Sequence, residues 1–278
     1  MAIILDGNAL AKQMKKQIKA EVEQMSTQPG LAVVIVGEDA ASHVYVNYKQ
    51  RDCAECGIRS EGFALAADAG EDELLALIYR LNKDDNIHGI LVQLPLPKGY
   101  SEQKVIEAIS PKKDVDAFTL QNVGRVMVGD YTFAPCTPYG VMKLLEHYGI
   151  DPAGKHCVVV GRSNIVGKPQ AMLMLHKHAT VSICHSRTPN LAEITRQADI
   201  LIAAVGKINL ITADMVKPGA VVVDVAINRN TDDGKLYGDV DFEAVKEVAS
   251  HITPVPGGVG PMTRAILMQN TLKAAKNA

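Results

Sequence analysis

Short runs of β-branched residues alternate with segments of helical periodicity along most of the chain, and this alternation constrains the fold more than any other feature. Strands that are connected by helices form parallel sheets, so the pattern predicts an α/β protein. In the first stretch we expect strands at residues 31–36 (LAVVIV), 58–65 and 89–94 (GILVQL), and helices at residues 7–25, 42–56 and 71–81.

A second stretch repeats the alternation after residue 140. We expect a helix from near Val141 to Gly149, strands at residues 155–160, 180–184, 199–205, 220–225 and, more weakly, 251–254, and a closing helix at residues 263–276. Residues 110–138, between the two stretches, are irregular and rich in Pro, Asp and Gly. A connection of this length is more often functional than slack, so we expect a cleft beside it.

Length and charge narrow the class further. A chain of 278 residues exceeds the ~250 residues near which one core stops growing, which favours two domains. Lys+Arg 29 against Asp+Glu 31 leave a net charge of -2, so no global positive field attracts nucleic acid or a membrane. No apolar run reaches the ~20 residues of a membrane span and no secretion signal is visible, so we expect a cytoplasmic protein.

The five cysteines are an odd number without regular spacing, which argues against a disulfide framework. Cys53-x-x-Cys56 is compatible with a redox or zinc motif, but no second pair or His cluster completes a site. The pair also falls inside a helical pattern. We therefore expect ordinary buried thiols and no metal.

A candidate dinucleotide site follows the strand expected at residues 155–160. Gly161 stands at the strand end and Gly167 opens the next helix, whose free N–H groups and dipole can hold a pyrophosphate. The fingerprint is degenerate, because Ser163 replaces the second Gly of G-x-G-x-x-G and the last Gly comes one place late. The alternative is a tight strand-to-helix turn without a ligand.

The end of the next strand bears on the choice of cofactor. NAD-selective sites usually place an acid there for the ribose 2′-hydroxyl, but this chain has His185-Ser186-Arg187-Thr188. Arg162 and Ser186, with Arg187, can instead surround a 2′-phosphate through charge-assisted hydrogen bonds. The pattern favours NADP, although Arg187 is about equally well explained as a solvated loop residue.

Five spaced motifs resemble the bifunctional methylenetetrahydrofolate dehydrogenase/cyclohydrolase family. The match runs in order from Asp6-Gly7 to Thr263. The five motifs are Ser42-x-x-Tyr45-x-x-x-Lys49, Gly89-Ile-Leu-Val-Gln93-Leu-Pro95-Leu-Pro97, Lys113-Asp114-Val115-Asp116, Gly161-Arg-Ser-Asn-Ile-Val-Gly-Lys-Pro169 and Pro254-Val-Pro256-Gly257-Gly258-Val-Gly260-Pro261-Met-Thr263. The resemblance implies NADP-dependent oxidation of methylenetetrahydrofolate, hydrolysis of the product to 10-formyltetrahydrofolate, and a place in one-carbon metabolism and purine biosynthesis.

The resemblance also implies an architecture of two α/β domains with the active-site cleft between them. Residues 1–140, joined by the closing helix 263–278, would form the folate-binding catalytic domain. Residues 141–262 would form the NADP-binding domain, a Rossmann-like doubly wound parallel sheet. The family further implies a homodimer, for which residues 199–225 offer strands and apolar helix surface.

Site residues carried over from the family form three groups. The catalytic group is Lys49, Gln93 and Asp116. The substrate-binding group is Tyr45, Lys49, Gln93, Asp116, Pro256, Gly257 and Gly258. The cofactor-binding group is Gly161, Arg162, Ser163, Ile165, Ser186 and Ile227.

Elementary chemistry agrees with the catalytic group. Tyr45 and Lys49 are four residues apart on one helix face, with Ser42 as a plausible N-cap. Desolvation in an apolar cleft lowers the pKa of a lysine toward the range useful for proton transfer, and Gln93 at a strand end could hold that amine. The alternative for Lys49 is a solvated helix lysine.

Asp116 can accept paired N–H donors from a pterin-like ring, and Asp114 is its rival two residues away. Two departures from the family pattern put local geometry in doubt, because Ala117 and Ala226 stand where the family has Gly. Residues 254–263 contain too many Pro and Gly residues for a helix or a central strand, so we expect a shaped loop that lines the cleft.

Two rival functions remain. A shikimate-type or amino-acid dehydrogenase could combine a Lys, an Asp and an NADP domain, but would not require the Gln93-Leu-Pro-Leu-Pro97 run. A dinucleotide-sensing protein without turnover would bind NADP and show no folate-dependent hydride transfer.

Overall fold

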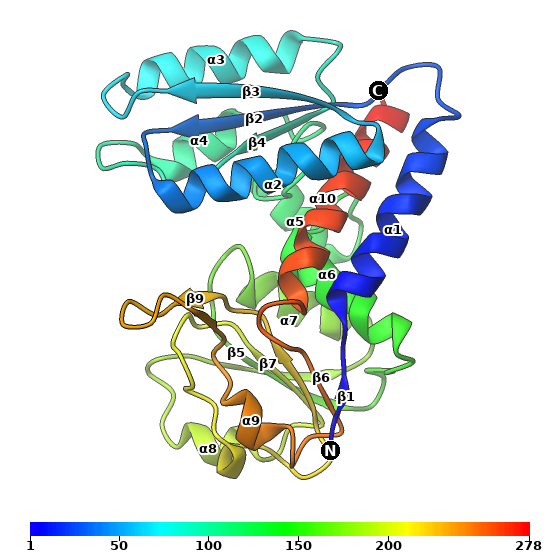
Figure 1. Ribbon diagram of the computed structural model, residues 1–278, viewed down its shortest axis with the longest axis vertical. Coiled ribbons are helices and arrows are strands. Elements are labelled where there is room, and N and C mark those ends of the chain that lie inside the picture. The colour runs from blue at the N-terminus through cyan, green and yellow to red at the C-terminus, as the bar shows by residue number, and fades with distance from the viewer. The chain divides into compact units, whose positions relative to one another are not determined.

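The computed structural model describes the backbone of residues 1–278 and the side chains of all but residues 40–43 and 45. The chain divides into two compact units (Figure 1). Unit 1 comprises Met1–Ala11 and Pro135–Thr263, and unit 2 comprises Lys12–Ala134 and Arg264–Ala278. From the resemblance we expected all of residues 1–140 in one domain, but residues 1–11 belong to unit 1 because strand β1 (Ile3–Ile4) pairs with β11 (His251–Ile252).

Unit 2 is built on a parallel three-stranded sheet in the order β3-β2-β4. Its elements are α1 (Gly7–Val22, which begins in unit 1), β2 (Gly30–Val36), α2 (Ala40–Cys56), β3 (Arg59–Leu65), α3 (Glu71–Lys83), β4 (Gly89–Val92), α4 (Glu102–Ala108), α5 (Leu120–Val128) and most of α10 (Val259–Lys276). Every residue of β2 is buried, because α2 and α3 cover opposite faces of the sheet (Figure 1). The continuous apolar run that predicted this strand is thus explained.

Unit 1 contains a parallel six-stranded sheet in the order β1-β11-β8-β7-β5-β6. Its further elements are α6 (Cys136–His147), β5 (His156–Val160), α7 (Gly167–His176), β6 (Thr180–Cys184), α8 (Leu191–Thr195), β7 (Ile200–Ala203), a 3-10 helix at Ala213–Met215, β8 (Val221–Asp224), the hairpin β9 (Asn228–Arg229) and β10 (Leu236–Tyr237), and α9 (Phe242–Val245). From β5 the chain adds β6 on one side and β7 on the other. This reversal confirms the doubly wound α/β class, and ligands of such sheets bind where the order reverses, at the carboxyl ends of the strands.

Three local expectations are wrong. The connector 110–138 is not wholly irregular, because it contains α5, which the Thr119 hydroxyl caps at its start and which ends at left-handed Gly129. Helix α10 begins at Val259, inside the Gly- and Pro-rich segment; Pro261 fits its first turn, where no N–H is needed. Helix α2 begins at Ala40, so Ser42 is not its N-cap residue.

The cysteines behave as buried thiols. All five are free and buried, and burial raises the pKa of Cys53, Cys56 and Cys157 to about 12. Thiols with such a pKa are poor nucleophiles and poor metal ligands at neutral pH.

Among the residues with described side chains, no helix is long and apolar enough to cross a membrane.

Candidate functional site

Lys49 and Gln93 meet in unit 2. The Lys49 ammonium donates a hydrogen bond of 2.8 Å to Gln93 Oε1, and Gln93 Nε2 donates one of 2.7 Å to the Leu94 carbonyl. Gln93 directly follows β4, and its own N–H continues the ladder to Val34 at 2.8 Å. The bond from Gln93 Nε2 to the Leu94 carbonyl fixes the orientation of the Gln93 amide, so that its Oε1 faces the Lys49 amine. Both side chains are half-buried.

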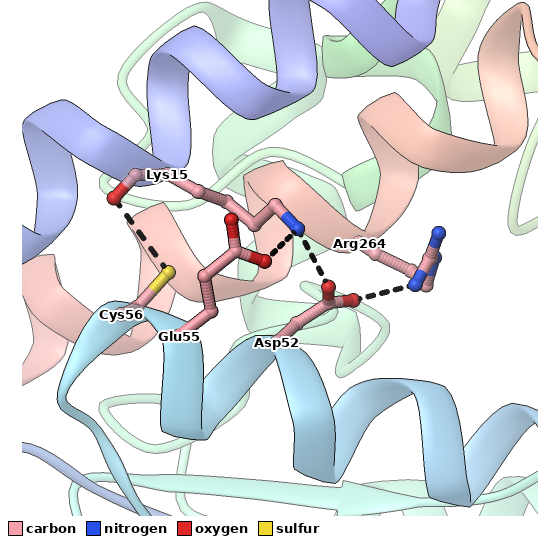
Figure 2. Close-up of polar contacts among 5 residues, drawn as sticks. All are labelled: Lys15, Asp52, Glu55, Cys56 and Arg264. Atoms are coloured by element: carbon pink, nitrogen blue, oxygen red, sulfur yellow. Dashed lines mark hydrogen bonds and ion pairs between the residues drawn. The ribbon is translucent and has the colours of Figure 1, made fainter.

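A charged cluster supports the helix that carries Lys49 (Figure 2). Asp52, only 3% exposed, accepts hydrogen bonds from Lys15 on α1 at 2.9 Å and from Arg264 on α10 at 2.8 Å. Glu55 is a second partner of Lys15. Burial lowers the pKa of Lys15, but the hydrogen bonds to Glu55 and Asp52 outweigh it and the pKa is raised.

The Arg264 guanidinium also lies over the ring of Tyr48, 4.9 Å from its centroid. Tyr48 and Asp52 are four residues apart and so lie on one face of α2. Arg264 therefore contacts the helix at two successive turns. The cluster fixes the part of α2 that begins at Tyr48, next to Lys49.

Hydrogen bonding assigns Asp114 a structural role. Asp114 is 2% exposed, and its carboxylate accepts from the backbone N–H groups of Phe118 and Thr119, from the Thr119 hydroxyl and from Asn122. These donors saturate it, so Asp114 shapes the loop that leads into α5. Asp116 is half-buried and is the member of the pair that remains a candidate for substrate.

The segment that carries Asp116 runs alongside β4. Asp114 pairs in parallel with Ile90, so the chain heads from there toward the strand end that bears Gln93. Ala117, where the family has Gly, is fully buried with a left-handed φ of 58°. This conformation costs a residue with a Cβ about 1 kcal/mol or more.

The expected phosphate loop leaves β5 at the reversal point of the unit 1 sheet. A Cβ on Gly161 would lie 2.3 Å from the Ala204 carbonyl oxygen, so only Gly lets the loops after β5 and β7 approach. Ser163 Oγ accepts from the N–H groups of Val166 at 3.1 Å and Gly167 at 3.3 Å. The serine that makes the fingerprint degenerate therefore caps the start of α7. Arg162, Ser163 and Ile165 are exposed.

Strand register places Arg162 and Ser186 in equivalent positions. Val160 of β5 pairs with Cys184 of β6, and each of the two candidates follows its strand by two residues. Both side chains are exposed at the carboxyl edge of the sheet. Arg187 is exposed too, and its backbone N–H donates to His185 Nδ1 at 3.1 Å.

The loop with Pro256, Gly257 and Gly258 packs against the start of α1. The Asn8 N–H donates to the Gly257 carbonyl at 3.0 Å, and a Cβ on Gly7 would lie 1.7 Å from the Gly258 carbonyl oxygen. The peptide bonds Val255–Pro256 and Leu94–Pro95 are cis.

Ile227, the last expected cofactor residue, is 37% exposed beyond the end of β8. Its neighbours Ala226 and Asn228 bond to two buried carboxylates, Asp224 and Asp239, which sequence analysis did not single out. Asp224 could have been recognised from sequence, since an apolar strand that ends in Asp often contributes to a site at the carboxyl ends of the strands. The side chain of Tyr45 lies outside the described residues.

Comparison with known proteins matches both parts of the chain to one family. Residues 5–116 match the tetrahydrofolate dehydrogenase/cyclohydrolase catalytic domain, and residues 135–278 match the NAD(P)-binding domain of that family. The bifunctional protein FolD of Magnetococcus marinus is 58% identical over 282 residues, which cover 100% of this chain and 99% of that protein.

Solved structures agree. The bifunctional FolD methylenetetrahydrofolate dehydrogenase/cyclohydrolase from Campylobacter jejuni has a TM-score of 0.97 at 50% identity and covers 100% of this chain and 99% of its own. The Trypanosoma brucei enzyme, solved with NADP cofactor and inhibitor, has a TM-score of 0.96 at 37% identity, with 99% and 98% covered. Shikimate dehydrogenase from Aquifex aeolicus shares only the fold, with a TM-score of 0.53 at 15% identity. The chain belongs to the tetrahydrofolate dehydrogenase/cyclohydrolase family.

Proposed function

We propose that the chain oxidises 5,10-methylenetetrahydrofolate to the 5,10-methenyl compound with NADP, and then hydrolyses the methenyl bridge to give 10-formyltetrahydrofolate. Family membership supports both activities. The observation that carries the assignment of the chemistry is the 2.8 Å hydrogen bond between Lys49 and Gln93 at the carboxyl end of β4.

Lys49 is the proton-transfer group of the hydrolysis. Water must lose a proton as it adds to the methenyl carbon, and the ring nitrogen that leaves must gain one. An amine that is held by a fixed amide oxygen is oriented for both transfers. Gln93 is its positioning partner, and the ion pairs of Asp52 keep the helix of Lys49 in place.

Asp116 anchors the pterin ring by accepting N–H donors from its amino-pyrimidine edge. The saturation of Asp114 supports this choice between the two carboxylates. Tyr45 packs its ring against the folate, and Pro256, Gly257 and Gly258 contribute backbone groups to substrate binding. Of these residues, Asp116 carries the specificity for the pterin.

When bound, NADP supplies the hydride acceptor. The Gly161 loop fits such a group, since it lies at the reversal point of the sheet and Gly161 lets it approach the loop after β7 closely. Arg162 and Ser186 bind the 2′-phosphate, Ser163 and Ile165 contact the cofactor from the same loop, and Ile227 contacts it from beyond β8.

The direct experiment records NADPH formation with methylenetetrahydrofolate, using NADP and NAD in turn, and then follows the loss of the methenyl absorbance. We expect both reactions and a preference for NADP. NADP binding without turnover would favour a dinucleotide-sensing protein and overturn the proposal.

We also propose a cytoplasmic homodimer that supplies one-carbon units for purine biosynthesis. The strands in the 199–225 region, β7 and β8, are wholly buried inside the sheet, so they do not provide the contact surface. The outer strand β6, with Ile183 41% exposed, is better placed. Light scattering at micromolar concentration should return twice the monomer mass of 29.9 kDa; the monomer mass would refute the dimer.

A further inference from the structure

Asp239 is a fully buried carboxylate that is bound by four N–H donors of unit 1. Its Oδ2 accepts from the backbone N–H groups of Val205 at 2.6 Å and Gly206 at 3.1 Å, and its Oδ1 from Lys207 at 2.7 Å and from the Asn228 side chain at 3.1 Å. Three successive backbone N–H groups that converge on one point form an anion-binding concavity. Here the chain's own carboxylate fills it.

Asp224 fixes the segment that carries Asp239. Asp224 is 3% exposed and accepts from the N–H groups of Ala226 at 3.2 Å, Asp239 at 3.0 Å and Val240 at 2.8 Å. A Cβ on Gly238 would lie 1.8 Å from Asp224 Oδ2, so the segment passes against the carboxylate with no space between them. Through these hydrogen bonds the two aspartates connect the segment after β8 to the loop after β7.

The loops after β7 and after β8 both lie where a dinucleotide would bind. Ala203 at the end of β7 pairs with Asp224 at the end of β8, so the segments that follow leave the same sheet edge. The loop after β7 also touches the phosphate loop, because the Ala204 carbonyl is the group that excludes a Cβ at Gly161. Ile227 lies between Ala226, which Asp224 holds, and Asn228, which Asp239 holds.

Neither carboxylate has a cationic partner among the residues whose side chains are described. Burying a charge that only dipoles compensate is costly, and neutral side chains would fill the space at lower cost. The carboxylates are therefore better explained by the geometry they impose than by stability. Each can hold several N–H donors at once, which an amide of the same shape cannot.

We infer that Asp239 and Asp224 are positioning residues for the cofactor, which hold residues 205–207 and 226–228 in the shape that binds the dinucleotide beside the Gly161 loop. The inference rests on the proposed cofactor site. Asp239 ties down both loops directly. Asp224 acts on the second loop through Ala226 and on the first through the backbone of Asp239.

The test compares Asp239→Asn, Asp224→Asn and the control Asp241→Asn by calorimetric titration with NADP. An amide at 239 leaves two donors facing its NH2 group, whereas one at 224 can rotate so that only the Val240 N–H is lost. Asp241 lies two residues away and caps α9 locally, where its carboxylate accepts from the Ala244 N–H at 3.4 Å. We expect the Kd for NADP to rise at least tenfold in Asp239→Asn, about threefold in Asp224→Asn and less than twofold in Asp241→Asn.

If the aspartates only stabilised the fold, their substitution would lower the fraction of active protein and leave both KM values unchanged. The KM values for NADP and for methylenetetrahydrofolate are therefore compared in each variant. We expect only the first to rise in Asp239→Asn. A folded Asp239→Asn protein with a Kd within twofold of wild type overturns the inference. If this variant does not fold, Asn228→Ala removes a single donor and should raise the Kd about threefold; no rise is equally decisive. Wild type that binds no NADP would instead refute the proposed function.

Discussion

Replacing Lys49 by Met removes the titrating amine and keeps an unbranched side chain of similar length. Hydride transfer needs alignment rather than a proton donor, because the iminium left by the departing hydride is stabilised by the folate nitrogens. Hydrolysis needs proton transfer at two steps. The substitution should therefore lower cyclohydrolase activity by ~10² or more, the usual scale for a lost acid–base group.

The hydrogen bond to Gln93 is too weak for its loss to unfold the protein. Lys49→Met removes the 2.8 Å hydrogen bond to Gln93, in a half-buried position that water can reach. Such a bond contributes about 1–2 kcal/mol to stability, against the ~5–15 kcal/mol that hold a domain folded. The folded fraction stays near one. A hundredfold loss of rate, about 2.7 kcal/mol in the barrier, would then belong to the chemistry.

The assay follows the decay of the methenyl absorbance with purified variants, with NADPH formation measured beside it. Lys16→Met is the matched control, since Lys16 is an exposed lysine on α1. We expect the control to match wild type in both assays, and Lys49→Met to bind NADP normally and to retain more dehydrogenase than cyclohydrolase activity. Cyclohydrolase turnover within a few-fold of wild type would refute the reasoning and move the proton-transfer role to Asp116 or to solvent.

Four further measurements test other parts of the structure. Arg162→Ala should weaken NADP by ~1.5–3 kcal/mol, as expected for a charged hydrogen bond to phosphate, and leave NAD almost unaffected; equal losses for both cofactors would exclude a 2′-phosphate contact. Asp52→Asn leaves Arg264 with a neutral acceptor and Lys15 with Glu55 alone as its carboxylate partner. It should lower the free energy of unfolding by about 2 kcal/mol in urea titrations followed by circular dichroism, whereas an unchanged midpoint would show that the cluster in Figure 2 is not stabilising. Burial raises the pKa of Asp224 to about 7, although the N–H donors of Asp239 and Val240 oppose it, so the folded chain keeps a proton that the unfolded chain releases above pH ~4. The stability of wild type relative to Asp224→Asn should then fall as pH rises from 5 to 7, and a rise would contradict it. The five cysteines should not react with a disulfide reagent at neutral pH until urea is added, and fast labelling of any one in the native protein would show an accessible thiolate.

Elements that bury a continuous apolar run were predictable from sequence. Strands β2, β5, β7 and β8 appear within one or two residues of their expected bounds, because a continuous apolar run in an α/β protein is buried as a strand inside the sheet. Helix α5 was also predictable in principle. Leu120, Val123 and Met127 follow a helical period between Thr119 and Gly129, both good cap residues, but the Pro- and Gly-rich surroundings concealed the signal.

Long-range hydrogen bonding was beyond the reach of sequence. Asp114 and Asp116 are chemically identical and two residues apart, so only the folded chain shows that four donors converge on the first. The same holds for Lys49, because the partner that orients its amine is 44 residues away. Residue type defines what a side chain can do, and the partners that the fold supplies determine what it does.

Asp224 and Asp239, which hold the loops of the proposed cofactor site, show most clearly what sequence alone cannot predict. A buried carboxylate costs several kcal/mol unless donors compensate it, so a position that keeps one must gain something a neutral residue cannot supply. At Asp239 the gain is the capacity to accept four hydrogen bonds from two loops at once. Residues that touch a ligand can be recognised from motifs, because the ligand's chemistry dictates their type. Residues that hold those motifs in shape follow the local backbone instead, and they become visible only when the N–H groups they accept from are known.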